Sequence, residues 1–163
     1  MSETLYSDPY FSVVQPDDGD AYIGCDNEVM IVPIDASGRV VLISEPSSAF
    51  GGSCLLLPGG MIDEGETCSV AANRELQEEA GYAAGSLRFL GEIRPFSKYL
   101  SVKTFIFVGQ DLVASQLSGD EAHDIEKQHI AGDDLLGLIQ NGKLNDARVI
   151  AALFMSGVVS LAT

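Results

Sequence analysis

Hydrophobic positions along the chain form short, β-branched runs that alternate with segments of helical periodicity. The runs at 29–34 and 39–43 flank the turn sequence Asp35-Ala36-Ser37-Gly38, so they predict a β-hairpin. Further strands are expected at 54–57, 86–93, 102–108 and 125–130, most of them bounded by glycine, proline or polar residues. The pattern therefore favours a domain built around a sheet.

A helix over residues 68–80 is the clearest element in the sequence. Thr67 can cap its first turn, its interior is rich in Ala, Leu, Glu and Gln, and Gly81 stands where a C-terminal glycine belongs. The helix has a narrow apolar stripe, which consists of Ser69, Ala72, Leu76 and Ala80. We expect this stripe to pack against the sheet.

Two more helices are predicted near the C-terminus. One spans 134–140 and is stopped by Asn141-Gly142, and the other runs from 147 to about 161 behind a cap at Asn145 or Asp146. Residues 1–20 are acidic and rich in turns, so we expect an N-terminal arm or edge hairpin there. Strands mixed with helices in 163 residues favour the α/β class and a single domain over 1–163.

Composition excludes several classes of protein. The 24 acidic and 9 basic residues give a formal charge of -15, and so few cations cannot readily form the basic face that a nucleic-acid binder needs. A hydrophobic fraction of 46% and a mean hydropathy of +0.17 exclude intrinsic disorder. We therefore expect an acidic globular domain with no nucleic-acid partner.

The cysteines, the first ten residues and the longest apolar stretch indicate the cellular compartment. Cys25, Cys54 and Cys68 are odd in number and form no C-x-x-C pair, which indicates free thiols in a reducing compartment. The polar first ten residues do not resemble a signal peptide, and the apolar stretch 149–162 is too short for a membrane span. The expected location is the cytoplasm, without a membrane partner.

Three carboxylates share one face of the predicted helix over 68–80. Glu75, Glu78 and Glu79 are related by i+3 and i+4 spacing, so they repel one another unless a cation lies among them. Carboxylate oxygens are the ligands that Mg²⁺ and Mn²⁺ prefer. Taken alone, the same pattern is also typical of a solvated acidic helix face.

The surrounding sequence decides between these two interpretations. Residues 60–82 read GMIDEGETCSVAANRELQEEAGY, which matches the Nudix box G-x5-E-x7-R-E-U-x-E-E-x-G-U with Tyr82 as an aromatic variant of its last position. The chain therefore resembles the Nudix hydrolases, which cleave nucleoside diphosphates linked to another group with the help of a divalent metal. The resemblance implies an α/β/α sandwich around a mixed β-sheet.

The resemblance also implies roles for particular residues. Glu75 and Glu79 match box positions that bind metal, with Glu78 as a further ligand or water-orienting group, and the backbone carbonyl of Gly59 completes the metal shell in many members. Glu66 and Arg74 match a pair that bridges the loop to the helix. We expect a structural role for that pair, because an arginine does not titrate near neutral pH.

A general base is expected on a loop distant from the box. In members of the family that act on ADP-ribose, a carboxylate on such a loop takes the proton of the attacking water. The loop 119–124 occupies the matching place here, and Glu121 is our candidate for the base, although an ordinary solvated loop acid is an equal alternative. His123 and Asp124 are weaker candidates.

A local cluster of basic and aromatic residues is the candidate substrate-binding segment. Arg94, Lys98 and Lys103 lie within ten positions and alternate with Phe96 and Tyr99. Such residues can pair with a diphosphate and stack on a base, and we select Arg94, Lys98 and Tyr99 for these roles. Pairing of the cations with surface acids is the structural alternative.

The resemblance is strongest to the branch of the family that hydrolyses ADP-ribose and other ADP compounds. The segments that carry it are 71–76, 109–112 and 142–148, although the branch's marker proline is replaced by Ser97. We therefore expect a Mg²⁺-dependent pyrophosphohydrolase, with Mn²⁺ as a possible substitute, acting on a small nucleotide-diphosphate substrate such as ADP-ribose. The alternatives are other substrates, such as dinucleoside polyphosphates, or a non-catalytic ligand sensor. A homodimer is a further expectation from the family.

Overall fold

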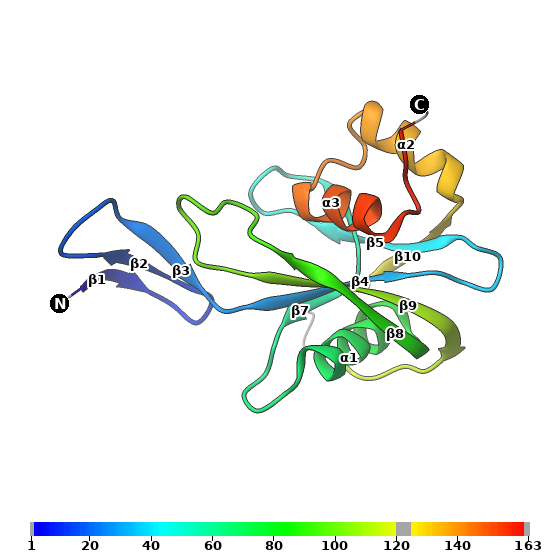
Figure 1. The fold of residues 1–163 in the computed structure, drawn as a ribbon, viewed down its shortest axis with the longest axis horizontal. Coiled ribbons are helices and arrows are strands. Elements are labelled where there is room, and N and C mark those ends of the chain that lie inside the picture. Colours follow the sequence, from blue (N-terminus) through cyan, green and yellow to red (C-terminus); the bar gives the residue numbers. More distant parts are fainter. Residues whose placement is uncertain (1, 120–124, 162–163) are drawn as a thin grey trace.

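The protein folds into layers, with helices on both sides of a central set of strands (Figure 1). The structure is a computed structural model and describes residues 2–119 and 125–161. Helix α1 (Cys68–Ala80) covers one side of the strands, whereas α2 (Gly132–Gln140) and α3 (Ala147–Ser156) lie on the other side. This arrangement confirms the expected α/β/α class.

The central strands form two sheets. The four-stranded sheet has the order β7-β4-β9-β8, and the three-stranded sheet has the order β10-β5-β6. Strands β4 and β9 are parallel, while the other neighbours in both sheets are antiparallel, so the sheet layer is mixed. The bounds are β4 Glu28–Pro33, β5 Val40–Pro46, β6 Ser53–Leu56, β7 Gly59–Met61, β8 Tyr82–Ile93, β9 Thr104–Ala114 and β10 Glu126–Ile130.

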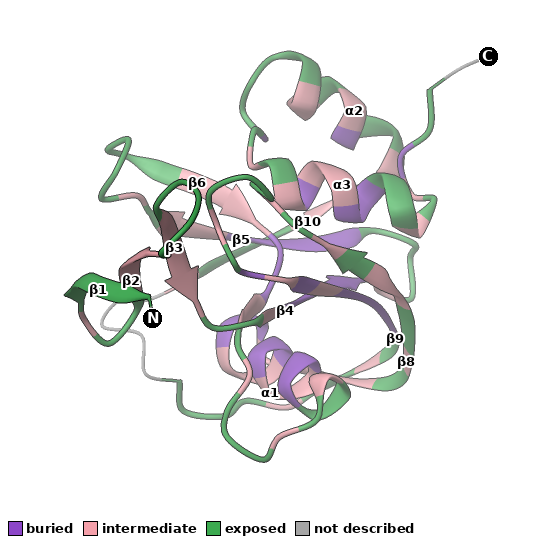
Figure 2. Ribbon diagram, turned by 60° about the vertical axis from the view of Figure 1, so that its left-hand side comes forward, coloured by how far each residue is buried: buried purple, intermediate pink, exposed green. Residues whose placement is uncertain are grey.

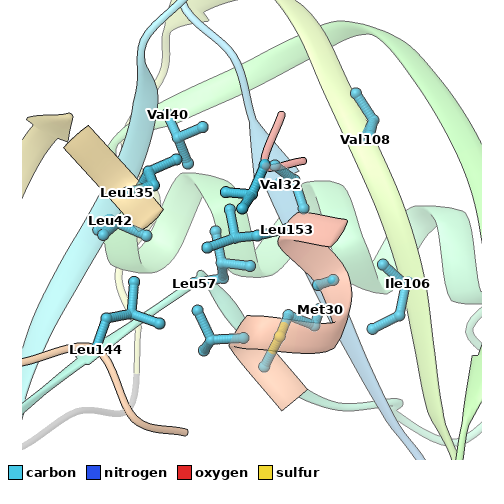
Figure 3. Packing of buried hydrophobic residues seen from close by; sticks show 13 residues of the cluster. Met30, Val32, Val40, Leu42, Leu57, Ile106, Val108, Leu135, Leu144 and Leu153 are labelled. Atoms are coloured by element: carbon cyan, nitrogen blue, oxygen red, sulfur yellow. The ribbon is translucent and has the colours of Figure 1, made fainter. Parts of the chain in front are cut away.

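Successive side chains of β4 and β5 point to opposite faces and form a hydrophobic core on each side of the strands. On β4, Val29 and Ile31 face the cluster under α1, while Met30 and Val32 face the cluster under α3. Figure 3 shows the second cluster, in which side chains of β4, β5 and β9 meet Leu153 of α3. Both sides of these strands are therefore closed by helices, which explains why their sequences are almost continuously apolar.

The prediction that the runs at 29–34 and 39–43 pair as a hairpin is wrong. Strand β4 lies between β7 and β9, so both of its hydrogen-bonding edges are taken. Strand β5 pairs instead with β6 and β10, and the two segments share one isolated β-bridge, between Ile34 and Val40. A short turn between two β-branched runs was therefore not sufficient to make them partners in one sheet.

Helix α1 has the predicted ends. The Thr67 hydroxyl accepts from the backbone N–H of Val70, and Gly81 closes the helix in the left-handed conformation with φ 67°. The buried face differs from the expected stripe at its N-terminal end, because Ser69 is exposed and Ala71 is buried. Figure 2 shows the buried side of α1 turned toward the strands.

The two C-terminal helices differ in their caps, because α2 begins after Ala131 without a side-chain cap whereas α3 has one. Helix α2 ends at Gln140 before Asn141, as predicted. Of the two candidate caps of α3, Asp146 is the one used, since its carboxylate accepts from the backbone N–H groups of Arg148 and Val149. The helix ends at Ser156, not near 161, because Gly157 adopts a left-handed conformation with φ 80°.

The N-terminal residues form a small sheet that projects from the body (Figure 1). Its strands β1 (Glu3–Ser7), β2 (Phe11–Gln15) and β3 (Tyr22–Cys25) form an antiparallel meander. The sheet attaches to the segment between β8 and β9, where Ile23 donates to the carbonyl of Tyr99 at 2.8 Å and accepts from Ser101 at 3.0 Å. In this sheet β1 is exposed along its whole length, whereas β3 is of intermediate exposure (Figure 2).

No helix within residues 2–119 and 125–161 has the combination of length and hydropathy that crossing a membrane requires.

Candidate active site

A cleft of 480 Å³ lies over the polar side of α1. Its walls come from α1, from β7, from the start of the loop after β9, and from the turn between β1 and β2. The lining residues are Tyr10, Gly59, Gly60, Met61, Asp63, Arg74, Glu75, Glu78, Glu79, Ser118 and Gly119. All three predicted metal-binding carboxylates and Gly59 are among them, so the structure brings these four together.

Strand β7 comes very close to two of the carboxylates. The backbone N–H of Gly59 donates to Oε2 of Glu79 at 2.8 Å. A Cβ atom placed on Gly60 would lie 2.5 Å from Oε1 of Glu75. Both glutamates are only 8% exposed, so this close approach holds their carboxylates at the base of the cleft. The absence of a side chain at Gly60 makes the approach to Glu75 possible, whereas a Cβ atom on Gly59 would meet the backbone of Val29 and Met30 in β4.

Arg74 connects the carboxylates to one another. Its Nη1 donates to Oε1 of Glu75 at 2.7 Å and to Oε2 of Glu78 at 3.0 Å. On its other side, Nε and Nη2 donate to the two oxygens of Glu66 at 3.1 and 3.0 Å. The predicted bridge between Glu66 and Arg74 is therefore present, and Arg74 additionally contacts two of the predicted metal ligands.

The charges in this network stabilise one another. Hydrogen bonds from Arg74 hold the pKa of the Glu66 carboxyl below its usual range. In turn, hydrogen bonds to Glu66, and then contacts with Glu75 and Glu78, raise the pKa of Arg74, although burial opposes this shift. Glu66 is consequently ionised, and Arg74 positively charged, throughout the physiological pH range.

The donor atoms in the cleft suit a hard divalent cation. Glu75, Glu78 and Glu79 offer carboxylate oxygens, which are the preferred ligands of Mg²⁺ and Mn²⁺. In the part of the chain that the structure describes, no three carboxylate, imidazole or thiol side chains already surround a common point. The chemistry of the residues fits a metal, and its binding requires the glutamates to turn from their present partners.

The candidate general base, Glu121, lies outside the described residues. Ser118 and Gly119, which precede it, line the cleft directly. Gln116, a little earlier in the same segment, donates from Nε2 to the carbonyl of Glu78 at 2.9 Å. The segment that leads to Glu121 is thus attached to α1 beside the predicted metal ligands.

The candidate substrate-binding residues lie between β8 and β9. Arg94 approaches Glu92 at 3.5 Å, and the Nζ of Lys98 lies 4.9 Å from the centre of the Tyr99 ring. Among the residues lining the described part of the cleft, Arg94, Lys98 and Tyr99 do not appear. Their role in substrate binding stays a prediction.

Tyr10 and Met61 are among the lining residues that were not singled out from the sequence. Tyr10 belongs to the turn between β1 and β2, where its backbone N–H donates to Oδ1 of Asp8 at 2.8 Å. Met61 follows the glycines of β7. Both also line a second cavity of 290 Å³ that includes Pro95 and Leu100, so this cavity adjoins the cleft. Nothing in the local sequence indicates that Tyr10 lines the same cleft as the helix carboxylates, because only the fold brings these segments together.

Fold and site together define a small α/β protein with a carboxylate cleft between a helix and a glycine-containing strand. The NUDIX domain family matches residues 26–153 of this chain. The chain belongs to the Nudix family.

Two curated relatives extend over most of the chain. ADP compounds hydrolase NudE of Escherichia coli (strain K12) is 37% identical over 127 residues, which are 78% of this chain and 68% of that protein. ADP-ribose pyrophosphatase of Bacillus subtilis (strain 168) is 21% identical over 127 residues, covering 77% of this chain and 69% of the relative.

A solved structure agrees with the fold. The crystal structure of an ADP compounds hydrolase matches with a TM-score of 0.82 and 32% identity, over 96% of this chain and 90% of that one. The similarity therefore includes the projecting N-terminal residues as well as the Nudix core.

Proposed function

We propose that the protein is a metal-dependent pyrophosphohydrolase that cleaves the diphosphate of an ADP-linked small molecule, such as ADP-ribose or a related ADP compound. The observation that carries this proposal is that Glu75, Glu78, Glu79 and Gly59 all line the same cleft. The names of the relatives, an ADP compounds hydrolase and an ADP-ribose pyrophosphatase, support the substrate class.

The proposed cofactor is Mg²⁺, with Mn²⁺ as a substitute, held by Glu75, Glu78 and Glu79 together with the carbonyl of Gly59. When bound, such a cation neutralises the diphosphate oxygens and activates water for attack on phosphorus. The chain itself supplies an anionic cleft in which Glu75 and Glu79 are buried. Arg74 donates to Glu75 and Glu78 through Nη1 and to Glu66 through Nε and Nη2.

Glu121 is proposed as the general base. A carboxylate can take the proton of the attacking water when it comes within hydrogen-bond reach of it. The place of Gly119 in the cleft lining, two positions earlier in the chain, supports this role. Arg94, Lys98 and Tyr99 remain our candidates for contacting the diphosphate and the base, supported by the cavity that Pro95 and Leu100 line beside the cleft.

We also propose a cytoplasmic homodimer. The projecting sheet exposes apolar side chains of β1 and β2, with Leu5 at 56%, Tyr6 at 53% and Phe11 at 40% exposure, and such side chains favour an interface. Light scattering of the purified protein should give the mass of two chains. The mass of one chain at micromolar concentration would contradict the dimer without affecting the proposed reaction.

A panel of nucleoside diphosphate derivatives tests the proposed reaction. We expect hydrolysis of ADP-ribose or another ADP compound with Mg²⁺ or Mn²⁺, measured by product release. Glu79→Gln should lower kcat/KM at least about 100-fold, because several kcal/mol of charge stabilisation depend on the metal. The exposed Glu64, outside the cleft lining, provides a control, and Glu64→Gln should be unchanged. Binding of a panel compound without turnover would instead support the sensor alternative.

Glu121→Gln tests the proposed base separately. Because the amide cannot accept the proton, we expect kcat to fall about 100-fold or more while KM changes little. Steady-state kinetics on the substrate found in the panel measure both constants. A rise in KM with unchanged kcat would remove Glu121 as the base.

A further inference from the structure

Arg74 and the proposed cation require the same carboxylates. In the structure, Nη1 of Arg74 donates at 2.7 Å to Oε1 of Glu75 and at 3.0 Å to Oε2 of Glu78. Charge-assisted bonds of this length are among the strong hydrogen bonds of proteins. An oxygen that accepts such a bond has to give it up, or share it, in order to coordinate a metal directly.

The guanidinium is held by other contacts as well. Its Nε and Nη2 donate to Glu66, and Nη2 also donates to the carbonyl of Met61 at 2.9 Å. The Arg74 side chain is only 22% exposed. Arg74 can therefore stay in place on Glu66 and β7 even when Nη1 loses Glu75 and Glu78.

We propose that Arg74 competes with the divalent cation for Glu75 and Glu78 and thereby sets the metal affinity of the site. A guanidinium stays protonated, so deprotonation of Arg74 does not release the two carboxylates. As the cation binds, the bonds from Nη1 to the two glutamates are exchanged for metal ligation, while the bonds from Nε and Nη2 to Glu66 persist. This inference rests on the proposed metal-dependent function.

The direction of one measurement separates competition from simple positioning. If Arg74 only orients Glu75 and Glu78 for the metal, its removal weakens metal binding. If Arg74 competes for their oxygens, its removal strengthens metal binding, because the metal no longer has to displace the guanidinium from those oxygens. The two roles thus predict changes of opposite sign.

The experiment measures the Mn²⁺ affinity of the protein by electron paramagnetic resonance, without substrate and at constant ionic strength. For Arg74→Gln we expect a Kd about tenfold lower than for the wild type, or about 1.4 kcal/mol. Arg74→Lys keeps the charge but loses the planar fork, so it should give a smaller decrease. Arg88, exposed on β8, provides a matched control for lost charge, and Arg88→Gln should bind Mn²⁺ within about twofold of the wild type.

An unchanged or weaker Mn²⁺ affinity of folded Arg74→Gln would overturn the inference. So would a wild-type affinity for Arg74→Lys combined with tighter binding by Arg74→Gln, because that pair of results indicates an effect of charge alone. A wild type that binds no Mn²⁺ would contradict the proposed function as well, which distinguishes the two failures.

Wild-type protein offers a second measurement, which does not depend on the folding of a variant. Nuclear magnetic resonance of the ¹⁵N-labelled arginine side chains can follow a titration with Mg²⁺. We expect the Nη1 hydrogens of Arg74 to change their environment while the Nε–H bonded to Glu66 keeps its own. Unaltered Nη1 signals at saturating Mg²⁺ would show that Arg74 keeps both glutamates, and the proposal would be wrong.

Discussion

Gly60 shows how one absent side chain shapes the site. Its backbone lies beside the carboxylate of Glu75, and a Cβ atom there would approach all three atoms of that carboxyl group within 3.0 Å. The sequence motif requires a glycine at this position but does not say why. The structure gives the reason, because Glu75 and β7 occupy the same small space.

Gly60→Ala should therefore damage the site more than the fold. We expect the added methyl group to displace Glu75, to lower metal-dependent activity strongly, and to decrease the free energy of unfolding by about 1–3 kcal/mol. Urea denaturation and activity measurements test this. Gly137 of α2 is a control with open space around it, and Gly137→Ala should stabilise the protein by about 0.5–1 kcal/mol. Full activity in Gly60→Ala would contradict the close packing described above.

Among the elements, helices were more predictable than strand partners. The ends of α1 depend on Thr67 and Gly81, which act within one turn of the chain. The pairing of β4 depends on β7 and β9, of which β9 lies more than seventy residues away. Most strands of the two central sheets were expected near their observed positions, but β3 and β7 were not expected, and the local sequence did not indicate which strands are neighbours.

The cap of α3 gives a prediction at this scale. Burial raises the pKa of the Asp146 carboxyl, but bonds from Arg148 and from backbone N–H groups outweigh it and hold the pKa below its usual 3.8. Because the folded pKa is the lower one, the carboxylate stabilises the fold above the unfolded pKa and loses this effect as the pH falls through the folded pKa.

Asp146→Ala should accordingly decrease the free energy of unfolding by about 1–2 kcal/mol at neutral pH, and by less in acid. Urea denaturation at several pH values measures the difference from the wild type. Asp146→Asn keeps a capping side chain without a titrating charge. Its free energy of unfolding at neutral pH should therefore lie between those of Asp146→Ala and the wild type. A difference between wild type and Asp146→Ala that stays constant down to about pH 2 would exclude the proposed linkage.

In the whole molecule, many of the basic side chains lie beside acidic ones. At least five of the nine cations form ion pairs, namely Arg39, Arg74, Arg94, Lys103 and Arg148. Arg148 joins α3 to Glu28 at the start of β4 at 2.9 Å. The remaining charge is strongly negative, so repulsion between surface acids acts against the compact state.

Added salt should therefore stabilise the protein. Raising NaCl from about 0.01 M to about 0.5 M shortens the screening length from roughly 30 Å to a few Å, which weakens long-range repulsion more than close ion pairs. We expect the Tm to rise by a few degrees in calorimetry without added metal. A lower Tm at high salt would mean that the ion pairs outweigh the net charge of -15.

The sequence by itself determined the family, the helix over 68–80 with its two caps, and the carboxylates that line the cleft, because each of these is encoded at short, fixed spacing along the chain. Only the tertiary structure decided that β4 and β5 pair with other strands, that Tyr10 lines the cleft, and that the backbone of β7 lies against the carboxylates of Glu75 and Glu79. These features arise where distant segments or competing side chains meet. Their geometry follows from how the whole chain packs, which spacing along one segment does not specify.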